Sequence, residues 1–236
     1  GQANIHAAGF TYAEYARRGF GELVVVALIS LGLILVLHTL GRRETPARQR
    51  GFTALSGLLI VLVLVILASA WQRLSLYEQV YGFTRLRTYA HLFIPWLGLA
   101  LLVVLGLLLT RQMQRVVTAA LLWGLGFGLL VGVWNVDAWV ARQNMERAVS
   151  GQELDGDYLQ TLSADAVPDL IRQAQRPELP TAVRDTLLIG LACRAAQTQP
   201  MPMPWPAFHL SQARAAQDLT RYAGLWQAYR VESDTE

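Results

Sequence analysis

The first 134 residues alternate between long apolar blocks and short polar segments. Four of the blocks contain no charged residue, and they occupy 23–37, 54–71, 92–109 and 116–134. A bilayer core of ~30 Å is crossed by ~20 helical residues, because each residue of an α-helix rises ~1.5 Å. With their flanks included, the blocks predict four membrane-spanning helices, at about 22–41, 52–71, 90–110 and 115–134.

The charge pattern changes where the fourth apolar block ends. Residues 1–134 hold 11 arginines and 4 acidic residues, a net charge of +7, whereas residues 135–236 hold 9 arginines and 13 acidic residues, a net charge of −4. We therefore predict an all-α protein with three parts. These are an interfacial N-terminal segment at 1–21, a transmembrane helical bundle at 22–134, and a helical polar domain outside the membrane at 135–236.

Three helices are expected in the polar domain. The stretch YLQTLSADAVPDLIRQAQ (158–175) is expected to be helical, with Ser163 or Asp165 as a candidate N-cap and Pro168 within the first turn, since a side-chain oxygen at the N-cap accepts from an unpaired backbone N–H. A second helix is expected to open with Thr181 as its candidate N-cap, and a third at about 209–230.

Composition agrees with a membrane protein and sets the orientation. Only 16% of the residues are charged and 53% are apolar, whereas a soluble domain is charged at ~25% of its positions. The loops 41–51 and 111–115 hold four and two arginines. Arginine-rich short loops stay in the cytoplasm, so the polar domain is predicted on the extracytoplasmic side.

The segment 72–89 joins the second and third predicted helices and is rich in arginine and aromatic residues. One interpretation is an interfacial segment that lies along the membrane surface and ends at Gly82, because Tyr77 and Tyr81 suit the boundary between lipid and water. The other is a polar pocket in which Glu78 pairs with Arg85 or Arg87.

Three glycines of the fourth apolar block, Gly124, Gly128 and Gly132, recur every four residues and therefore share one helix face. Such a face lets another helix backbone approach closely. It serves either a partner subunit or a flat cofactor, or it packs against helices of this same chain.

Other chemistry leaves few signals. One cysteine, Cys193, and four scattered histidines give no metal-ligand spacing, and no phosphate-binding loop or nucleophile motif is present. No cofactor is predicted, and the chain is not expected to be an enzyme. The pI of about 9.3 comes from arginines that flank the membrane helices, so it gives no reason to expect nucleic acid.

Three phrases in order resemble a known family: TYAEYARRGFGELVVVALISL, RLSLYEQVYGFTRLRTYAH and NVDAWVARQNMERAVSGQELDGDYLQTLSADAVPDL. They are similar to bacterial polytopic membrane proteins of domain-of-unknown-function family 4173, close to family 4153, over roughly residues 10–170. The resemblance implies a bacterial plasma (inner) membrane and, because family members usually carry further helices upstream, a chain that is the later part of such a protein. The matching motif positions are Tyr15, Arg17, Arg18, Tyr77, Tyr81, Gly82, Arg85, Arg87, Asn135, Asp137 and Asn144.

With the predicted topology, many of these polar residues lie at one membrane face. The candidate pocket consists of Arg17, Arg18, Tyr77, Glu78, Tyr81, Arg85, Arg87, Asn135 and Asp137. Guanidinium groups bind phosphate and carboxylate well, so the set suits an anionic ligand or a lipid headgroup. It suits equally an internal network that holds the polar domain onto the bundle.

Two roles follow from these interpretations. The first is a non-enzymatic scaffold, sensor or accessory subunit, whose partners are the lipid bilayer and either other membrane subunits or upstream helices of the same protein. The alternative is a transporter, or a lipid- or anion-binding protein that uses the arginine- and tyrosine-rich pocket. A membrane enzyme acting on lipid-linked substrates is third, since no acid and base pair with suitable spacing supports it.

Overall fold

A computed structural model describes residues 12–40, 45–198 and 209–229, without the side chains of 12–21, 23, 39 and 40. All regular structure in these ranges is helical, which confirms the predicted all-α class. The chain divides into two compact units. Unit 1 comprises Gly1–Tyr81 and Leu86–Gly132, and unit 2 comprises Gly82–Arg85 and Val133–Glu236.

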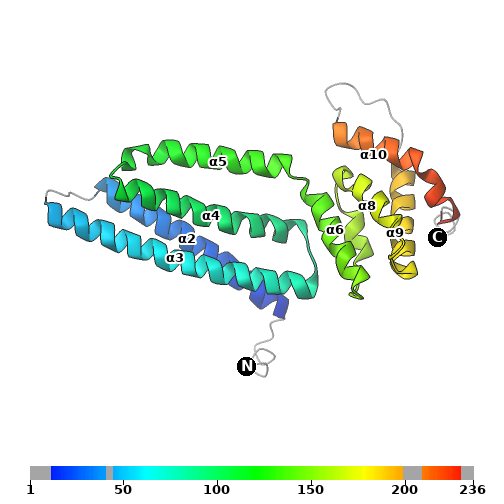
Figure 1. Ribbon diagram of the computed structural model, residues 1–236, viewed down its shortest axis with the longest axis horizontal. Helices are drawn as coiled ribbons and strands as arrows, with labels where there is room; N and C mark the ends of the chain where they lie inside the picture. The colour runs from blue at the N-terminus through cyan, green and yellow to red at the C-terminus, as the bar shows by residue number, and fades with distance from the viewer. Residues whose placement is uncertain (1–11, 41–44, 199–208, 230–236) are drawn as a thin grey trace. The chain divides into compact units, whose positions relative to one another are not determined.

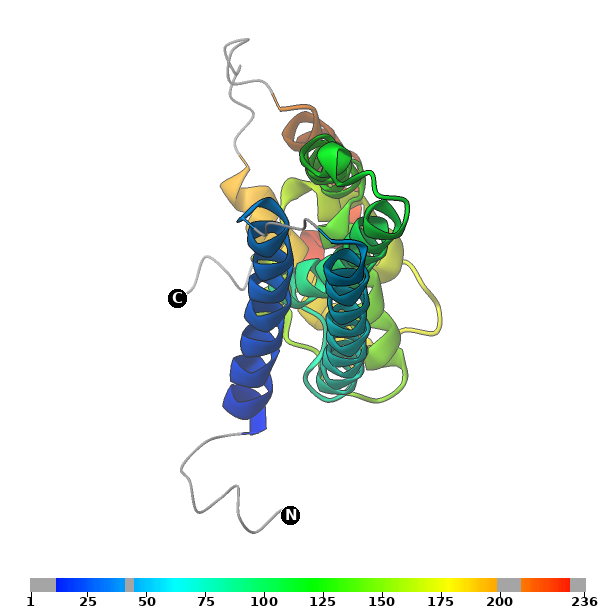
Figure 2. The same ribbon diagram turned by 90° about the vertical axis from the view of Figure 1, so that its left-hand side faces the viewer.

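Unit 1 is a bundle of long helices. It contains α2 (Tyr12–Leu40), α3 (Pro46–Tyr81), α4 (Arg85–Leu109), the short 3₁₀ turn η1 (Met113–Arg115) and α5 (Val116–Val133). Helices α2 and α3 lie side by side (Figures 1 and 2). Their shared core includes Ile34, Ile60 and Leu67, and α4 adds Leu101 to it. In contrast, α5 contributes no buried residue.

Three helical segments among the described residues are long and apolar enough to cross a membrane: Pro46–Tyr81, Arg85–Leu109 and Met113–Val133. A further apolar helix, Val24–His38, falls short of that length within the residues that the structure describes. Apolar side chains cover much of the outer surface of this unit, as hydrocarbon rather than water requires. The chain is therefore a membrane protein with about four spans, close to the predicted number.

Helix α3 is longer than a bilayer requires. Its 36 residues extend about 54 Å at the usual helical rise, so its last turns reach past a ~30 Å hydrocarbon core. Residues 72–81 continue α3, and residues 85–89 begin α4. The expected segment at 72–89 is thus divided between two helices and their turn, and its place at a membrane interface stays a prediction. Gly82, with φ of 78°, ends α3, as the sequence indicates, because a left-handed backbone favours glycine.

Unit 2 is a small helical domain with its own core. It contains α6 (Val136–Val149), α7 (Gly156–Gln160), η2 (Ala164–Ala166), α8 (Val167–Ala174), α9 (Thr181–Gln197), α10 (Leu210–Arg221), η4 (Ala223–Leu225) and η5 (Gln227–Tyr229). Helices α6, α8 and α9 pack in sequence, and α10 packs on α8 and α9 (Figure 1). Met145, Ile171, Leu191 and the fully buried Trp226 form the centre of the core.

The predicted helices of this domain are right in type and partly wrong in extent. Helix α9 begins at Thr181, but its N-cap is Pro180, so the prediction that Thr181 caps the helix is wrong. The stretch 158–175 is broken into α7, η2 and α8, and neither Ser163 nor Asp165 caps it through a side-chain hydrogen bond. Instead Asp155 caps α7 by accepting from the Tyr158 N–H. The last helix ends at Arg221, because the chain then turns twice as 3₁₀ helix to bury Trp226.

Candidate functional site

Residues 82–85, the turn between α3 and α4, form part of unit 2, and Asn144 of α6 holds their backbone. The Phe83 N–H donates to Asn144 Oδ1 at 2.9 Å, and Asn144 Nδ2 donates to the Phe83 carbonyl at 2.8 Å. One side chain therefore satisfies both backbone groups of one residue. Gly82 suits this turn because its φ of 78° is a left-handed backbone conformation that side-chain-bearing residues rarely adopt.

Arg85 and Asp137 form the charged centre of this arrangement, which we call the turn clamp: Gly82–Arg85 together with Asp137, Asn144 and Tyr158. Arg85 Nε and Nη2 donate to the two oxygens of Asp137 at 2.5 and 2.7 Å. Such a two-pronged pair is geometrically specific. Arg85 Nη2 also donates to the Thr161 carbonyl at 2.9 Å, and the Arg85 backbone N–H donates to Tyr158 Oη at 2.7 Å.

Asp137 is buried and charged. Its Oδ2 also accepts from the Ser163 N–H at 2.7 Å. Burial by itself raises the pKa of this carboxyl, but the hydrogen bonds from Arg85 and Ser163 outweigh burial and hold the pKa below its ordinary value. The carboxylate is consequently ionised at neutral pH. Its two oxygens accept hydrogen bonds from other groups of the protein itself.

Arg194 of α9 is a half-buried arginine close to this network, and the sequence analysis did not identify it. It donates to the carbonyls of Gln160 and Leu162 at 2.6 Å each and to that of Ser163 at 3.4 Å. Burial and the nearby positive charge of Arg85 lower the pKa of Arg194, and Asp137 opposes them. The side chain thus fixes the loop between α7 and η2. Its only sequence signal is an arginine in the otherwise apolar stretch LLIGLACRAA.

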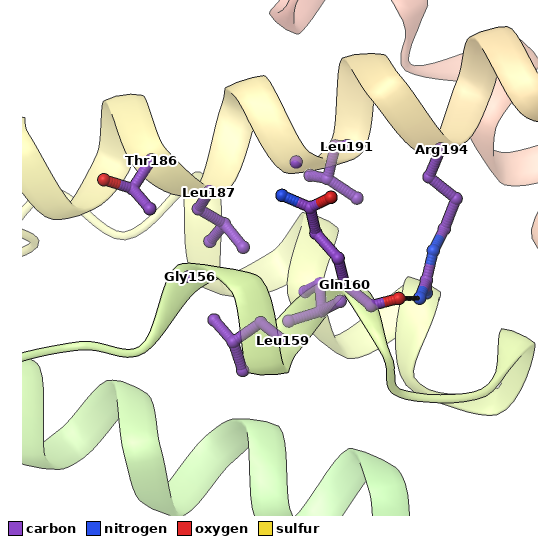
Figure 3. A pocket seen from close by; sticks show the side chains of 9 residues that line it. Gly156, Leu159, Gln160, Thr186, Leu187, Leu191 and Arg194 are labelled. Atoms are coloured by element: carbon purple, nitrogen blue, oxygen red, sulfur yellow. Dashed lines mark hydrogen bonds between the residues drawn. The ribbon is translucent and has the colours of Figure 1, made fainter.

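The space between α7 and α9 beside Arg194 holds no ligand cavity. Figure 3 shows Gln160 lying against α9 and its carbonyl bonded to Arg194. A Cβ atom on Gly156 would collide with Thr186, and one on Gly190 would meet Gln160 at 3.4 Å. The remaining volume is about 10 Å³, which is about what one water requires.

Asn135 also has a structural role in unit 2. Its Oδ1 caps α6 by accepting from the Ala138 N–H at 2.9 Å, and its Nδ2 donates to the Asp165 carbonyl at 2.8 Å. Asn135 therefore connects the start of α6 to η2. Of the predicted pocket residues in unit 2, Arg85 and Asp137 contact each other.

The other predicted pocket residues with described side chains, Tyr77, Glu78, Tyr81 and Arg87, belong to unit 1. Arg87 donates to Tyr77 Oη and to the Tyr81 carbonyl, both at 3.3 Å, and its guanidinium lies 4.4 Å from the centre of the Tyr77 ring. The side chains of Arg17 and Arg18 lie outside the described part of the chain.

Glu78 has a different partner from the two arginines considered for it. The side chain is almost completely buried, and its Oε2 lies 2.7 Å from His91 Nδ1. That separation suits an ion pair or a hydrogen bond in which Nδ1 carries the proton. Oε1 has no hydrogen-bond partner among the described atoms. Arg85 pairs instead with Asp137, 52 positions later.

The glycine face of α5 is open within this chain. No described atom lies within 4 Å of a Cβ built on Gly124, Gly128 or Gly132. Gly126, which was not assigned to the face, is instead approached by Trp96 at 3.3 Å. Packing of the predicted face against this chain's own helices is therefore not seen in the described ranges, and its use against another molecule stays a prediction.

Metal chemistry finds no support in the described ranges, where no three His, Cys, Asp or Glu side chains gather closely enough to hold an ion. The polar residues that do gather neutralise one another. They can order a turn and a domain.

Comparison with known proteins places the chain in a family without a described activity. No curated protein and no solved structure matches it. A family model matches residues 1–173, which include the turn clamp and all four predicted spans. The matched family has the number 4153, whereas the resemblance in the sequence suggested family 4173 with 4153 as its neighbour. The chain belongs to the family described as Domain of unknown function (DUF4153).

Proposed function

We propose that this membrane protein is a non-enzymatic scaffold, sensor or accessory subunit of a membrane complex, with unit 2 as its contact surface. The observation that carries the proposal is the saturation of the turn clamp. Arg85 is bonded to Asp137 and Thr161, and Asp137 is bonded to Arg85 and Ser163. Groups committed to one another in this way stabilise a domain, whereas a ligand site would keep donors available.

Membrane topology supports an arrangement in which the turn and unit 2 share one side. Two membrane-crossing segments, Arg85–Leu109 and Met113–Val133, separate the turn from α6. Two crossings return the chain to the side it left, in agreement with the contact between Arg85 and Asp137. The arginine density of loops 41–51 and 111–115 then favours an extracytoplasmic position for unit 2, and the family resemblance favours a bacterial inner membrane.

The test is purification of the tagged, full-length protein from its native membranes in a mild detergent. The proposal expects a defined set of protein partners in fixed ratio. Arg85→Gln, which breaks the turn clamp, should weaken their recovery. Arg48→Gln, at an exposed position near the start of α3 in unit 1, is the matched control and should leave recovery unchanged. Helical content and detergent melting of each variant separate lost assembly from lost folding.

The alternative role, a transporter or an anion- or lipid-headgroup-binding protein, draws on Arg87, a half-exposed guanidinium stacked on Tyr77. It predicts the opposite result in the same preparation. The protein would be recovered without protein partners, and it would bind vesicles that contain an anionic phospholipid. That binding would be lost in Arg87→Gln and retained in Arg214→Gln. This outcome would overturn the scaffold proposal.

A further inference from the structure

Three aromatic side chains of unit 2 gather where the chain joins the membrane-crossing segments. Trp134 follows directly after the segment Met113–Val133, and Phe83 lies two positions before the segment Arg85–Leu109. Trp139 of α6 contacts both, with its ring centre 6.0 Å from that of Trp134 and 5.2 Å from that of Phe83. These three side chains, which we call the aromatic cluster, are all partly exposed.

The depth of this cluster in the bilayer follows from the chain itself. The 21 residues of Met113–Val133 extend about 32 Å as a helix, which matches a hydrocarbon core of ~30 Å. The segment therefore ends close to the boundary between hydrocarbon and headgroups, and the Trp134 backbone follows about 3.8 Å further on. Because Trp139 contacts Trp134, its ring also lies within reach of the headgroup layer, which is roughly 5–7 Å thick.

The outer face of α6 changes in character along the helix. Arg142 follows Trp139 by three positions and Glu146 follows Arg142 by four, so the three side chains share one face. Trp139 and Arg142 lie within ~9 Å of Val136 along the helix axis, whereas Glu146 lies ~15 Å from it. The face is thus aromatic and basic at the end that joins the membrane segment, and acidic further out. Aromatic and basic side chains together suit a phospholipid surface, whose phosphates are anionic.

Arg142 keeps positive charge available for such a surface. Its Nη2 donates to Asp169 Oδ1 at 3.2 Å, but the same oxygen accepts a shorter bond, of 2.7 Å, from Arg172. Two guanidinium groups therefore share one carboxylate, and the three groups together carry a net positive charge. The Arg142 side chain is 48% exposed, and an exposed guanidinium at the edge of a bilayer can bind lipid phosphate.

We propose that the face of unit 2 formed by the aromatic cluster and Arg142 is seated in the interfacial layer of a phospholipid bilayer, with the indole rings of Trp134 and Trp139 among the headgroups and Arg142 on lipid phosphate. Indole suits that layer because its ring is apolar and its N–H can donate to lipid oxygens. This lipid contact goes beyond the scaffold role and does not depend on it, since protein partners would bind other surfaces of unit 2.

The test measures whether lipid reaches the indole rings, and at what depth. The full-length protein is reconstituted in phosphatidylcholine vesicles whose acyl chains carry bromine, a contact quencher of indole fluorescence, either near the headgroup or near the terminal methyl. Subtracting the emission of Trp139→Phe from that of the wild type isolates Trp139, and Trp134→Phe isolates Trp134 in the same way. Trp226→Phe is the matched control, since Trp226 is fully buried in the same unit.

Two variants keep the test independent of a folding defect. Among the described residues, Trp139 packs against the core of unit 2, whereas Trp134 is not part of that packing. Trp134→Phe should therefore fold even if Trp139→Phe does not, and the helical content of each variant is measured first.

Bromine near the headgroup should quench the emission of Trp134 and Trp139 at least about twofold more than bromine near the methyl end, because interfacial indole lies at the shallower depth. The Trp226 emission should not change. Arg142→Gln should weaken the shallow quenching of Trp139, because the phosphate contact is lost. Absence of quenching at both Trp134 and Trp139 would overturn the proposal, since protein would then cover the face. Stronger quenching by the deep bromine would also overturn it, since the rings would then lie in hydrocarbon.

Discussion

Replacing Asn144 by alanine removes both hydrogen bonds that hold the backbone of Phe83 in unit 2. The two bonds, 2.9 and 2.8 Å long, are the described contacts of this side chain with the turn. Each is worth a net ~1 kcal/mol, so local opening of the turn should become easier by about 2 kcal/mol. The contact of the Phe83 ring with Trp139, at 5.2 Å, remains and keeps the global fold.

The assay is hydrogen–deuterium exchange of the full-length protein in lipid nanodiscs, followed by mass spectrometry of the peptide that contains Gly82–Arg85. A loss of 2 kcal/mol corresponds to a factor of about 30 in the opening equilibrium, and exchange at Phe83 should accelerate by that factor. Gln143→Ala, one position earlier in α6, is the matched control and should leave exchange unchanged. An acceleration below about threefold in Asn144→Ala, or an equal change in Gln143→Ala, would refute the assigned role.

Three further outcomes are expected. Gly82→Ala should destabilise the turn by about 1–2 kcal/mol because of its left-handed backbone; thermal melting measures this loss. The folded-state pKa of Asp137 is held below the ordinary value of about 3.8, so its stabilisation is complete above that pH and is lost as pH falls further. Melting temperature against pH should therefore fall less steeply below that value in Asp137→Asn than in the wild type. Trp226→Ala should cost about 3–5 kcal/mol of unfolding free energy, because the side chain is fully buried in unit 2; a loss below about 1 kcal/mol would contradict that burial.

The membrane-spanning helices could be predicted from the sequence because each one depends only on its own apolar residues. Lipid offers no hydrogen bonds to the backbone, so a long apolar block can only be helix. The break at Gly82 was similarly local, since glycine tolerates the left-handed backbone observed there. The breakup of 158–175 into α7, η2 and α8 was not predicted, because apolar spacing does not reveal where tertiary packing interrupts a helix.

The pairing of Arg85 with Asp137 could not be predicted from the sequence. Arg85 and Asp137 were both among the candidate pocket residues, but 52 positions and two membrane segments separate them. No periodicity links residues at that distance. Glu78 was likewise considered without His91, and only the approach of α3 and α4 brings the two side chains to 2.7 Å. Arg194 was missed, because nothing in its neighbours in the sequence distinguishes a half-buried arginine that binds carbonyls from a solvated one.

The inclusion of residues 82–85 in unit 2 constrains how the protein can be made. The turn leaves the ribosome before Asp137 and Asn144 are translated, and both later membrane segments must be inserted before those side chains can reach it. The turn must therefore stay hydrated and unengaged during synthesis. For the same reason a fragment beginning at Val133 would carry Asp137 without Arg85, so soluble expression of that fragment alone would yield a domain with an unneutralised buried carboxylate.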